Sequence, residues 1–141
     1  EDRRRLVRQP ELIDTAIEEF LRAYAPVTMA REIVEDTELG GCPMRKGEMV
    51  MLSFPAANRD SQKFTDADEV RIDRKENPHV AFGLGIHRCI GSNLARMEMR
   101  IALQAWLKRI SDFELDQERP MTWSEVAVRG PRLLPILIAS A

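Results

Sequence analysis

The sequence contains little cysteine and no long apolar run. Its two cysteines, Cys42 and Cys89, are too few for a disulfide framework, and no secretion signal is visible. No stretch is apolar for long enough to span a membrane as a helix. From these absences we expect a cytoplasmic protein without a membrane segment.

An excess of charge of one sign is also missing. The 21 Lys and Arg residues nearly balance the 23 Asp and Glu residues, so the formal net charge is −2. Proteins that bind nucleic acid usually carry a basic surface, and we therefore expect no such partner. The length of 141 residues suits one globular domain, with an ordinary 44% of hydrophobic and 31% of charged residues. Because the first residue is Glu1 rather than Met, we expect a piece of a longer protein.

The most informative stretch is rich in glycine and sets a cysteine at the start of a predicted helix. Phe82–Gly91 contains three glycines around Cys89, and a helical pattern runs from Ser92 to about Ile110. A helix N-terminus favours the thiolate, because it carries partial positive charge and free N–H groups. Glycines also let the main chain lie close to a flat ligand. Cys89 is therefore a candidate metal ligand or nucleophile, although a lone cysteine is more often a small buried residue.

The spacing around Cys89 is far more specific than the cysteine alone. The pattern Phe-x-x-Gly-x-x-x-Cys-x-Gly is met by Phe82, Gly85, Cys89 and Gly91, and Leu-Ala-Arg follows in the helix. This stretch closely resembles the heme-binding signature of the cytochrome P450 family, the heme-thiolate monooxygenases, in its soluble bacterial form. The resemblance implies that Cys89 is the axial ligand of the heme iron. It implies heme contacts from Arg31, Phe82, Gly83, His87, Cys89, Ile90, Gly91 and Ala95.

A first long helix is predicted from Pro10 to about Tyr24, where apolar residues recur every three or four positions. Its polar side carries Glu19 and Arg22, three residues apart. Spacing alone would make them a solvated pair that contributes about 0.2–0.5 kcal/mol. The resemblance instead implies a structural triad of Glu19, Arg22 and Arg74, in which the loss of one partner would leave a buried charge unpaired.

Short antiparallel strands are predicted between the first helix and the cysteine loop. Alternating residues at 27–34 predict one strand, and a further pair is predicted at 40–43 and 49–52 around a turn at 45–48. The other expected elements are a short helical segment at 56–60, a packed coil at 61–77 and two strands at 126–128 and 133–138, separated by Gly130 and Pro131.

The resemblance also assigns roles to residues of these strands. The positions that match one wall of the family's substrate pocket are Val27, Thr28, Met29, Ala127 and Val128. They are mostly apolar, which predicts a small apolar organic substrate. Arg31 has two interpretations: an edge residue facing water or, by the resemblance, a partner of a heme propionate together with His87.

The helix after Cys89 carries a polar stripe, formed by Asn93, Arg96, Arg100, Gln104 and Lys108. We interpret the stripe as a solvated face. In the alternative, Arg88 with Arg96 or Arg100 helps to dock an acidic electron-transfer protein. Apolar residues around the rest of this helix predict that most of its surface is buried.

These observations predict a mainly helical α+β fold, the C-terminal part of the cytochrome P450 fold, with two long helices, small antiparallel sheets and a long ordered coil. By the resemblance, residues 1–141 are the C-terminal part of one heme-thiolate monooxygenase domain whose distal-helix half is absent. No catalytic residue beyond the heme ligand is then expected in this chain. The isolated chain should expose a broad apolar surface.

The activity that the resemblance implies is the insertion of one oxygen atom from O2 into an organic substrate, with heme b as the cofactor. The electrons would come from NAD(P)H through a ferredoxin reductase and a ferredoxin. Three alternatives stay open: an electron-transfer or sensor protein with thiolate-bound heme, a peroxide-driven family member, and a nonfunctional truncated fragment. A zinc or nucleophile role for Cys89 is disfavoured, because no cluster of further ligands and no activating base is arranged around it in the sequence.

Overall fold

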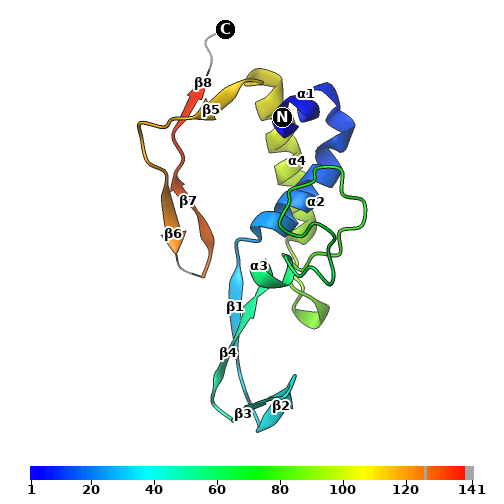
Figure 1. Cartoon of the computed structure of the whole chain (residues 1–141), viewed down its shortest axis with the longest axis vertical. Helices are drawn as coiled ribbons and strands as arrows, with labels where there is room; N and C mark the ends of the chain where they lie inside the picture. The colour runs from blue at the N-terminus through cyan, green and yellow to red at the C-terminus, as the bar shows by residue number, and fades with distance from the viewer. Residues whose placement is uncertain (126, 139–141) are drawn as a thin grey trace.

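Two long helices that pack against each other form the centre of the fold. The computed structural model describes residues 1–125 and 127–138. Helix α2 (Ile13–Tyr24) follows a 3-10 turn at Pro10–Leu12, and helix α4 (Ser92–Arg109) lies beside it (Figure 1). Both helices lie where the sequence predicts them. The small two-stranded antiparallel sheets around them confirm the expected α+β class.

Helix α1 (Asp2–Arg8) is an element that the sequence does not predict. Its sequence has four arginines and only two apolar residues, so it shows no clear amphipathic pattern. Two tertiary contacts hold it: Leu6 is buried in the core, and Arg5 forms an ion pair with Asp73 at 2.7 Å. The helix therefore depends on the rest of the chain rather than on its own sequence pattern.

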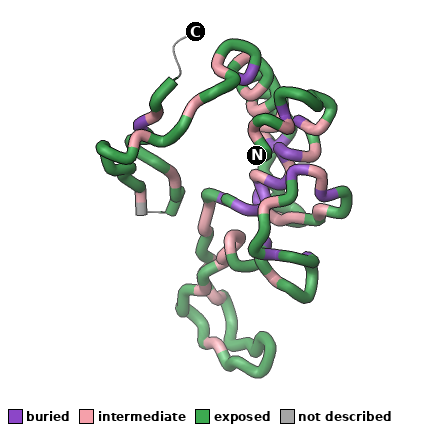
Figure 2. The backbone as a smooth tube through the Cα atoms, turned by 45° about the horizontal axis from the view of Figure 1, so that its top comes forward, coloured by how far each residue is buried: buried purple, intermediate pink, exposed green. Residues whose placement is uncertain are grey.

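The buried core lies along one side of α2, because apolar residues recur there every three or four positions. Its members are Leu6, Ile13, Ala16, Ile17, Leu21, Ala25, Ile72, Ala81 and Leu107. They come from α1, α2, the coil before the cysteine loop and the end of α4. In Figure 2 the buried segments gather around these helices, whereas the strands are mostly exposed.

The strands between α2 and the coil form one hairpin nested inside another. Strand β1 (Thr28–Glu32) pairs with β4 (Met49–Ser53), and β2 (Thr37–Leu39) pairs with β3 (Cys42–Met44). The predicted pairing of 40–43 with 49–52 is therefore wrong. Gly40 and Gly41 have φ of 59° and 80° and form the two-residue turn of the inner hairpin. The turn at 45–48 only leads from β3 into β4.

A long coil connects the strands to the cysteine loop. Helix α3 (Phe54–Ala57) precedes this coil and begins two residues before the helical segment expected at 56–60. The Ser53 hydroxyl caps the helix by accepting a hydrogen bond from the Ala56 N–H at 3.4 Å. No helix or strand occurs between α3 and the 3-10 turn at Gly85–His87, which confirms the predicted coil at 61–77. Figure 1 shows this coil folded over α2.

Two more sheets follow α4 and lie to one side of the helices in Figure 1. Strand β5 (Phe113–Leu115) pairs with β8 (Ile136–Ile138), and β6 (Thr122–Glu125) pairs with β7 (Arg129–Leu133). All the sheets are antiparallel, as expected for strands joined by short reversals.

The predicted strand positions in this region are wrong. Within 126–128, Val126 lies outside the described residues, and Val128 forms only an isolated bridge to Val27. The segment at 133–138 is divided between the end of β7 and β8. Gly130 and Pro131, predicted to separate the strands, lie inside β7, and the pairing of β6 with β7 is irregular beside Trp123, which faces Pro131. A proline cannot donate to the ladder, which accounts for a local irregularity at this point.

Candidate cofactor site

The cysteine loop closes on itself through main-chain hydrogen bonds. The Cys89 N–H donates to the Phe82 carbonyl at 2.9 Å, and the Arg88 N–H donates to the Gly85 carbonyl at 3.1 Å. Gly83 and Gly85 have φ of 72° and 61°, in a backbone region that residues with a Cβ rarely adopt. The two glycines therefore allow the sharp reversal that returns the chain to the start of α4.

Cys89 lies at the N-terminal end of α4 with its thiol exposed. Its carbonyl accepts the Ser92 N–H at 3.2 Å, so the residue is fixed to the first turn of the helix. A Cβ at Gly91 would come within 3.8 Å of the sulfur, so glycine leaves that side of the thiol open.

The cysteine loop carries exposed apolar residues, with the exposed polar residues His87 and Arg88 directly before Cys89. Ile86 and Ile90 are 97% and 103% exposed, and Leu84 is exposed as well. Phe82 is half-buried at the base of the loop, and Ala95 lies in the first turn of α4, where its N–H donates to the Gly91 carbonyl. An exposed sulfur donor in a loop with exposed apolar side chains fits the iron and the flat face of a heme, whereas a hydrated metal ion would need several polar ligands.

The residues predicted to bind heme propionates lie on separate segments. His87 is exposed in the cysteine loop, and Arg31 is partly buried in β1, where its guanidinium donates to the Ala30 carbonyl at 2.8 Å. No hydrogen bond or ion pair between described residues joins Arg31 to the loop. Both side chains retain N–H groups that could donate hydrogen bonds to a carboxylate.

The predicted substrate-wall residues are brought together by strand pairing. Val27 and Val128 form an antiparallel bridge, and the Thr28 N–H donates to the Ala127 carbonyl at 2.9 Å. Met29 follows in β1, and both Met29 and Val128 are exposed. Segments about a hundred residues apart in the chain thus meet at one small apolar surface.

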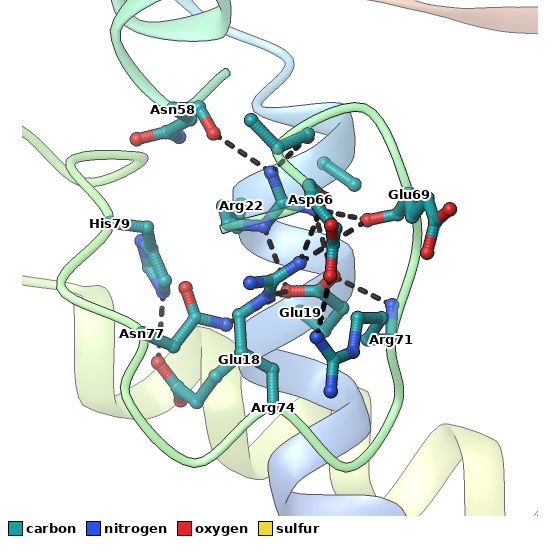
Figure 3. Close-up of polar contacts among 12 residues, drawn as sticks. Glu18, Glu19, Arg22, Asn58, Asp66, Glu69, Arg71, Arg74, Asn77 and His79 are labelled. Carbon is teal, nitrogen blue, oxygen red and sulfur yellow. Dashed lines mark hydrogen bonds and ion pairs between the residues drawn. The ribbon is translucent and has the colours of Figure 1, made fainter. Parts of the chain in front are cut away.

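Glu19, Arg22 and Arg74 form a buried network beneath the coil (Figure 3). The Arg22 Nη2 and Nε donate to the two Glu19 oxygens at 2.8 Å each, and the Arg74 Nε donates to Glu19 at 3.0 Å. Glu19 and Arg22 are fully buried. The two guanidinium groups also donate to carbonyls of the coil, those of Asn58, Thr65, Asp66, Ala67 and Glu69. The network therefore ties the coil to α2.

Glu18 forms a second network that the sequence does not predict. Arg96 Nε and Nη2 donate to its two carboxylate oxygens at 2.5 and 2.8 Å, and His79 Nε2 donates at 2.9 Å. The hydrogen bonds from Arg96 are the main cause that lowers the pKa of Glu18, with His79 adding to them and burial opposing them. Glu18 is 78 residues from Arg96 in the chain, and no sequence spacing links the two.

Most of the polar stripe of α4 is exposed, as expected for a solvated face: Asn93, Arg100, Gln104 and Lys108 are exposed, and only Arg96 is partly buried. Two of its basic residues also pair with acidic residues of α2. Besides the contacts of Arg96, the Arg100 Nε lies 2.7 Å from an Asp14 oxygen on α2. Two of the basic charges considered for docking a partner are therefore paired within the chain. The predicted burial of most of α4 is also wrong: its apolar residues Leu94, Met97 and Ile101 are 54%, 53% and 58% exposed.

No group of three or more His, Cys, Asp or Glu side chains gathers where it could hold a metal ion within 1–125 and 127–138. Within the same ranges, no helix is both long enough and apolar enough to cross a membrane.

The amino-acid sequence of the chain is similar to those of characterised proteins. The family model described as Cytochrome P450 matches residues 5–133. The chain is 43% identical to the mycinamicin IV hydroxylase/epoxidase of Micromonospora griseorubida, over 96% of this chain and 35% of that protein. It is 42% identical to the steroid C26-monooxygenase of Mycolicibacterium smegmatis, over 94% of this chain and 33% of that protein. It thus spans about a third of the length of these curated relatives.

A solved structure shows the same fold. The bacillaene polyketide synthase cytochrome P450 PksS of Bacillus subtilis 168 superposes with a TM-score of 0.91 at 40% identity. The match covers 96% of this chain and 36% of that chain. The fold described above is therefore a portion of a larger known fold.

Proposed function

The chain belongs to the cytochrome P450 family, and from this premise we propose that it forms the heme-binding part of a monooxygenase with Cys89 as the thiolate ligand of the heme iron. The observation that carries the proposal is the exposed Cys89 thiol at the N-terminal end of α4, within the glycine loop. Residues 1–141 would then be part of one heme-thiolate domain. Its activity would be the insertion of one oxygen atom from O2 into a small organic substrate.

The residues of the loop would bind and shield the cofactor. Cys89 would supply the sulfur ligand, while Phe82 and Ile90 would exclude water from it. Gly83 allows the sharp turn of the loop, and Gly91 would leave room for the close approach of the macrocycle, which Ala95 would contact from α4. When bound, heme b would supply the oxygen chemistry, which a thiolate ligand promotes by donating electron density to the iron.

Donor groups at two other places would orient the cofactor. Arg31 and His87 would donate to the heme propionates, since guanidinium and imidazole N–H groups form strong hydrogen bonds with carboxylates. The paired segments with Val27 and Val128 would form part of the wall against an apolar substrate, together with Thr28, Met29 and Ala127. The electron donors would be a ferredoxin and its NAD(P)H-dependent reductase.

Heme content tests the proposal. We expect Cys89→Ala to lose heme on purification, because no other thiolate is available at the start of α4. The matched control is Cys42→Ala, which removes the other exposed cysteine, in strand β3. Equal heme content in the two variants would contradict the assignment of Cys89.

A further inference from the structure

Glu18 connects the segments on both sides of the cysteine loop. It accepts two hydrogen bonds from Arg96, which lies in α4 just after the loop. It also accepts one from His79, which lies three residues before Phe82, where the loop begins. A single carboxylate on α2 therefore holds the chain as it enters the loop and as it leaves it (Figure 3 shows the His79 contact).

Contacts continue from these partners into the loop itself. The guanidinium carbon of Arg96 lies 4.8 Å from the centroid of the Phe82 ring, a cation–π arrangement. The Phe82 carbonyl in turn accepts the Cys89 N–H at 2.9 Å. On the other side, His79 Nδ1 accepts the Ala81 N–H at 3.2 Å, so its ring hydrogen lies on Nε2, which donates to Glu18.

We propose that Glu18 is a positioning residue for Cys89, acting through Arg96 and His79 without touching the sulfur. The inference rests on the proposed function, in which Cys89 ligates heme iron. Bidentate, charge-assisted hydrogen bonds fix the direction of a guanidinium group. By fixing Arg96 against Phe82, Glu18 holds the carbonyl that binds the Cys89 N–H. Supporting contacts of this kind set the orientation of metal ligands.

Burial makes the His79 contact hard to replace. The His79 side chain is only 3% exposed, whereas Glu18 is 32% exposed. The Glu18→Gln substitution would offer one neutral acceptor oxygen in place of two charged ones, so His79 and Arg96 would compete for it, and a buried donor left unpaired is costly. The segment with His79 and Ala81 should then shift, and with it the start of the loop.

The chain offers a closely matched control. Asp14 and Arg100 form another ion pair between α2 and α4, at 2.7 Å, one helical turn away from Glu18 and Arg96. This pair contacts no residue of the cysteine loop through the hydrogen bonds and ion pairs of the described residues. Asp14→Asn therefore removes the same charge from the same helix as Glu18→Gln, but leaves the loop supports in place.

Hydrogen exchange of the Cys89 amide in the heme-free full chain tests the loop directly. We expect Glu18→Gln to speed this exchange about tenfold, because the hydrogen bond to Phe82 opens more often once its charge-assisted support is lost. Asp14→Asn should leave the rate unchanged. If Glu18→Gln fails to fold, Arg96→Lys makes the same test, since it keeps the charge but loses the bidentate contact.

The heme-loaded protein gives a second readout, the share of the reduced CO complex with the absorption band of thiolate ligation. We expect Glu18→Gln to lower this share relative to wild type, and Asp14→Asn to leave it unchanged. Equal behaviour of the two variants in both measurements would overturn the role of Glu18. A wild-type protein without the thiolate band would instead refute the proposed function, while the amide exchange would still decide whether Glu18 supports the loop.

Discussion

Two neighbouring glutamates on α2 hold different parts of the chain. Consecutive residues of a helix point in different directions, so Glu19 contacts the coil while Glu18 contacts His79 and Arg96 on either side of the cysteine loop. Glu19 accepts hydrogen bonds from the Arg22, Arg74 and Asn77 side chains and from the Arg71 N–H. Since Glu19 is fully buried, every one of these contacts is shielded from water.

Glu19→Ala should strongly destabilise the chain. The substitution leaves Arg22, which is fully buried, without its counter-ion, and breaking a buried ion pair typically costs about 3–5 kcal/mol. The free energy of unfolding in urea measures the effect. The control is Asp68→Asn at an exposed pair, where Arg59 lies 3.5 Å from a 93% exposed Asp68, and a small change is expected there. Similar losses in both variants would contradict the account.

Acid should unfold the chain through these glutamates. Burial raises the pKa of Glu19, but hydrogen bonds from Arg22 and the Arg71 N–H, with the charges of Arg22 and Arg74, outweigh it and bring the pKa below 4.5. The pKa of Glu18 is lowered as well, mainly by Arg96. A carboxyl with a lowered folded-state pKa stabilises the fold above its unfolded-state pKa, and this contribution is lost as the pH falls through the folded-state value.

The unfolding free energy should therefore fall as the pH drops below 4.5, the ordinary value for these glutamates. Glu19→Gln cannot titrate, so its stability should depend less on pH in this range, from a lower starting value. Urea unfolding at a series of pH values measures both slopes. An unchanged slope in Glu19→Gln would show that another group causes the acid sensitivity.

At the scale of elements, the cysteine loop depends on its backbone conformation. Gly83→Ala should strain the loop, because φ of 72° costs a residue with a Cβ about 1–2 kcal/mol, and the new Cβ would lie 3.5 Å from the His87 carbonyl. We expect a smaller share of thiolate-ligated heme in the CO spectrum. Gly130→Ala, where nothing lies within 4 Å of the new Cβ and φ is not positive, serves as the control. A normal share in Gly83→Ala would contradict this view of the loop.

The elements that could be predicted from the sequence are those identified by a residue pattern within their own segment. The apolar repeat of α2 and the spacing of the loop around Cys89 are both local, and both identify their segments. Strand pairing was harder to predict, because Gly40 and Gly41 make a turn inside the segment at 40–43 that was predicted as a strand. The partners of Glu18 could not be predicted, since Arg96 is 78 residues away and only tertiary packing brings the two together.

At the scale of the whole molecule, α4 has two unlike faces. Its basic residues Arg96 and Arg100 face acidic residues of α2, while Leu94, Met97 and Ile101 are more than half exposed. The spacing of these apolar residues places them on one face of the helix. The chain therefore presents an apolar helix face to water, of a kind that usually marks a contact surface.

This face should bind a hydrophobic fluorescent dye. We expect the double variant Met97→Glu and Ile101→Glu to lower dye binding with little change in unfolding free energy, because both side chains are largely exposed. Leu107→Glu on the same helix is the contrast: Leu107 is 8% exposed, so a buried charge there should destabilise the fold. Unchanged dye binding in the double variant would show that the dye binds to a surface other than this face of α4.

The most direct test of the central claim is the absorption spectrum of the reduced, CO-bound protein after heme is added. If Cys89 is the axial ligand, the wild type shows the red-shifted Soret band typical of thiolate ligation, and Cys89→His, which retains an iron ligand but no thiolate, loses it. The measurement should be repeated on the longest chain that contains this sequence. A thiolate band that persists in Cys89→His, or its absence from that longer wild-type chain, would contradict the assignment of Cys89.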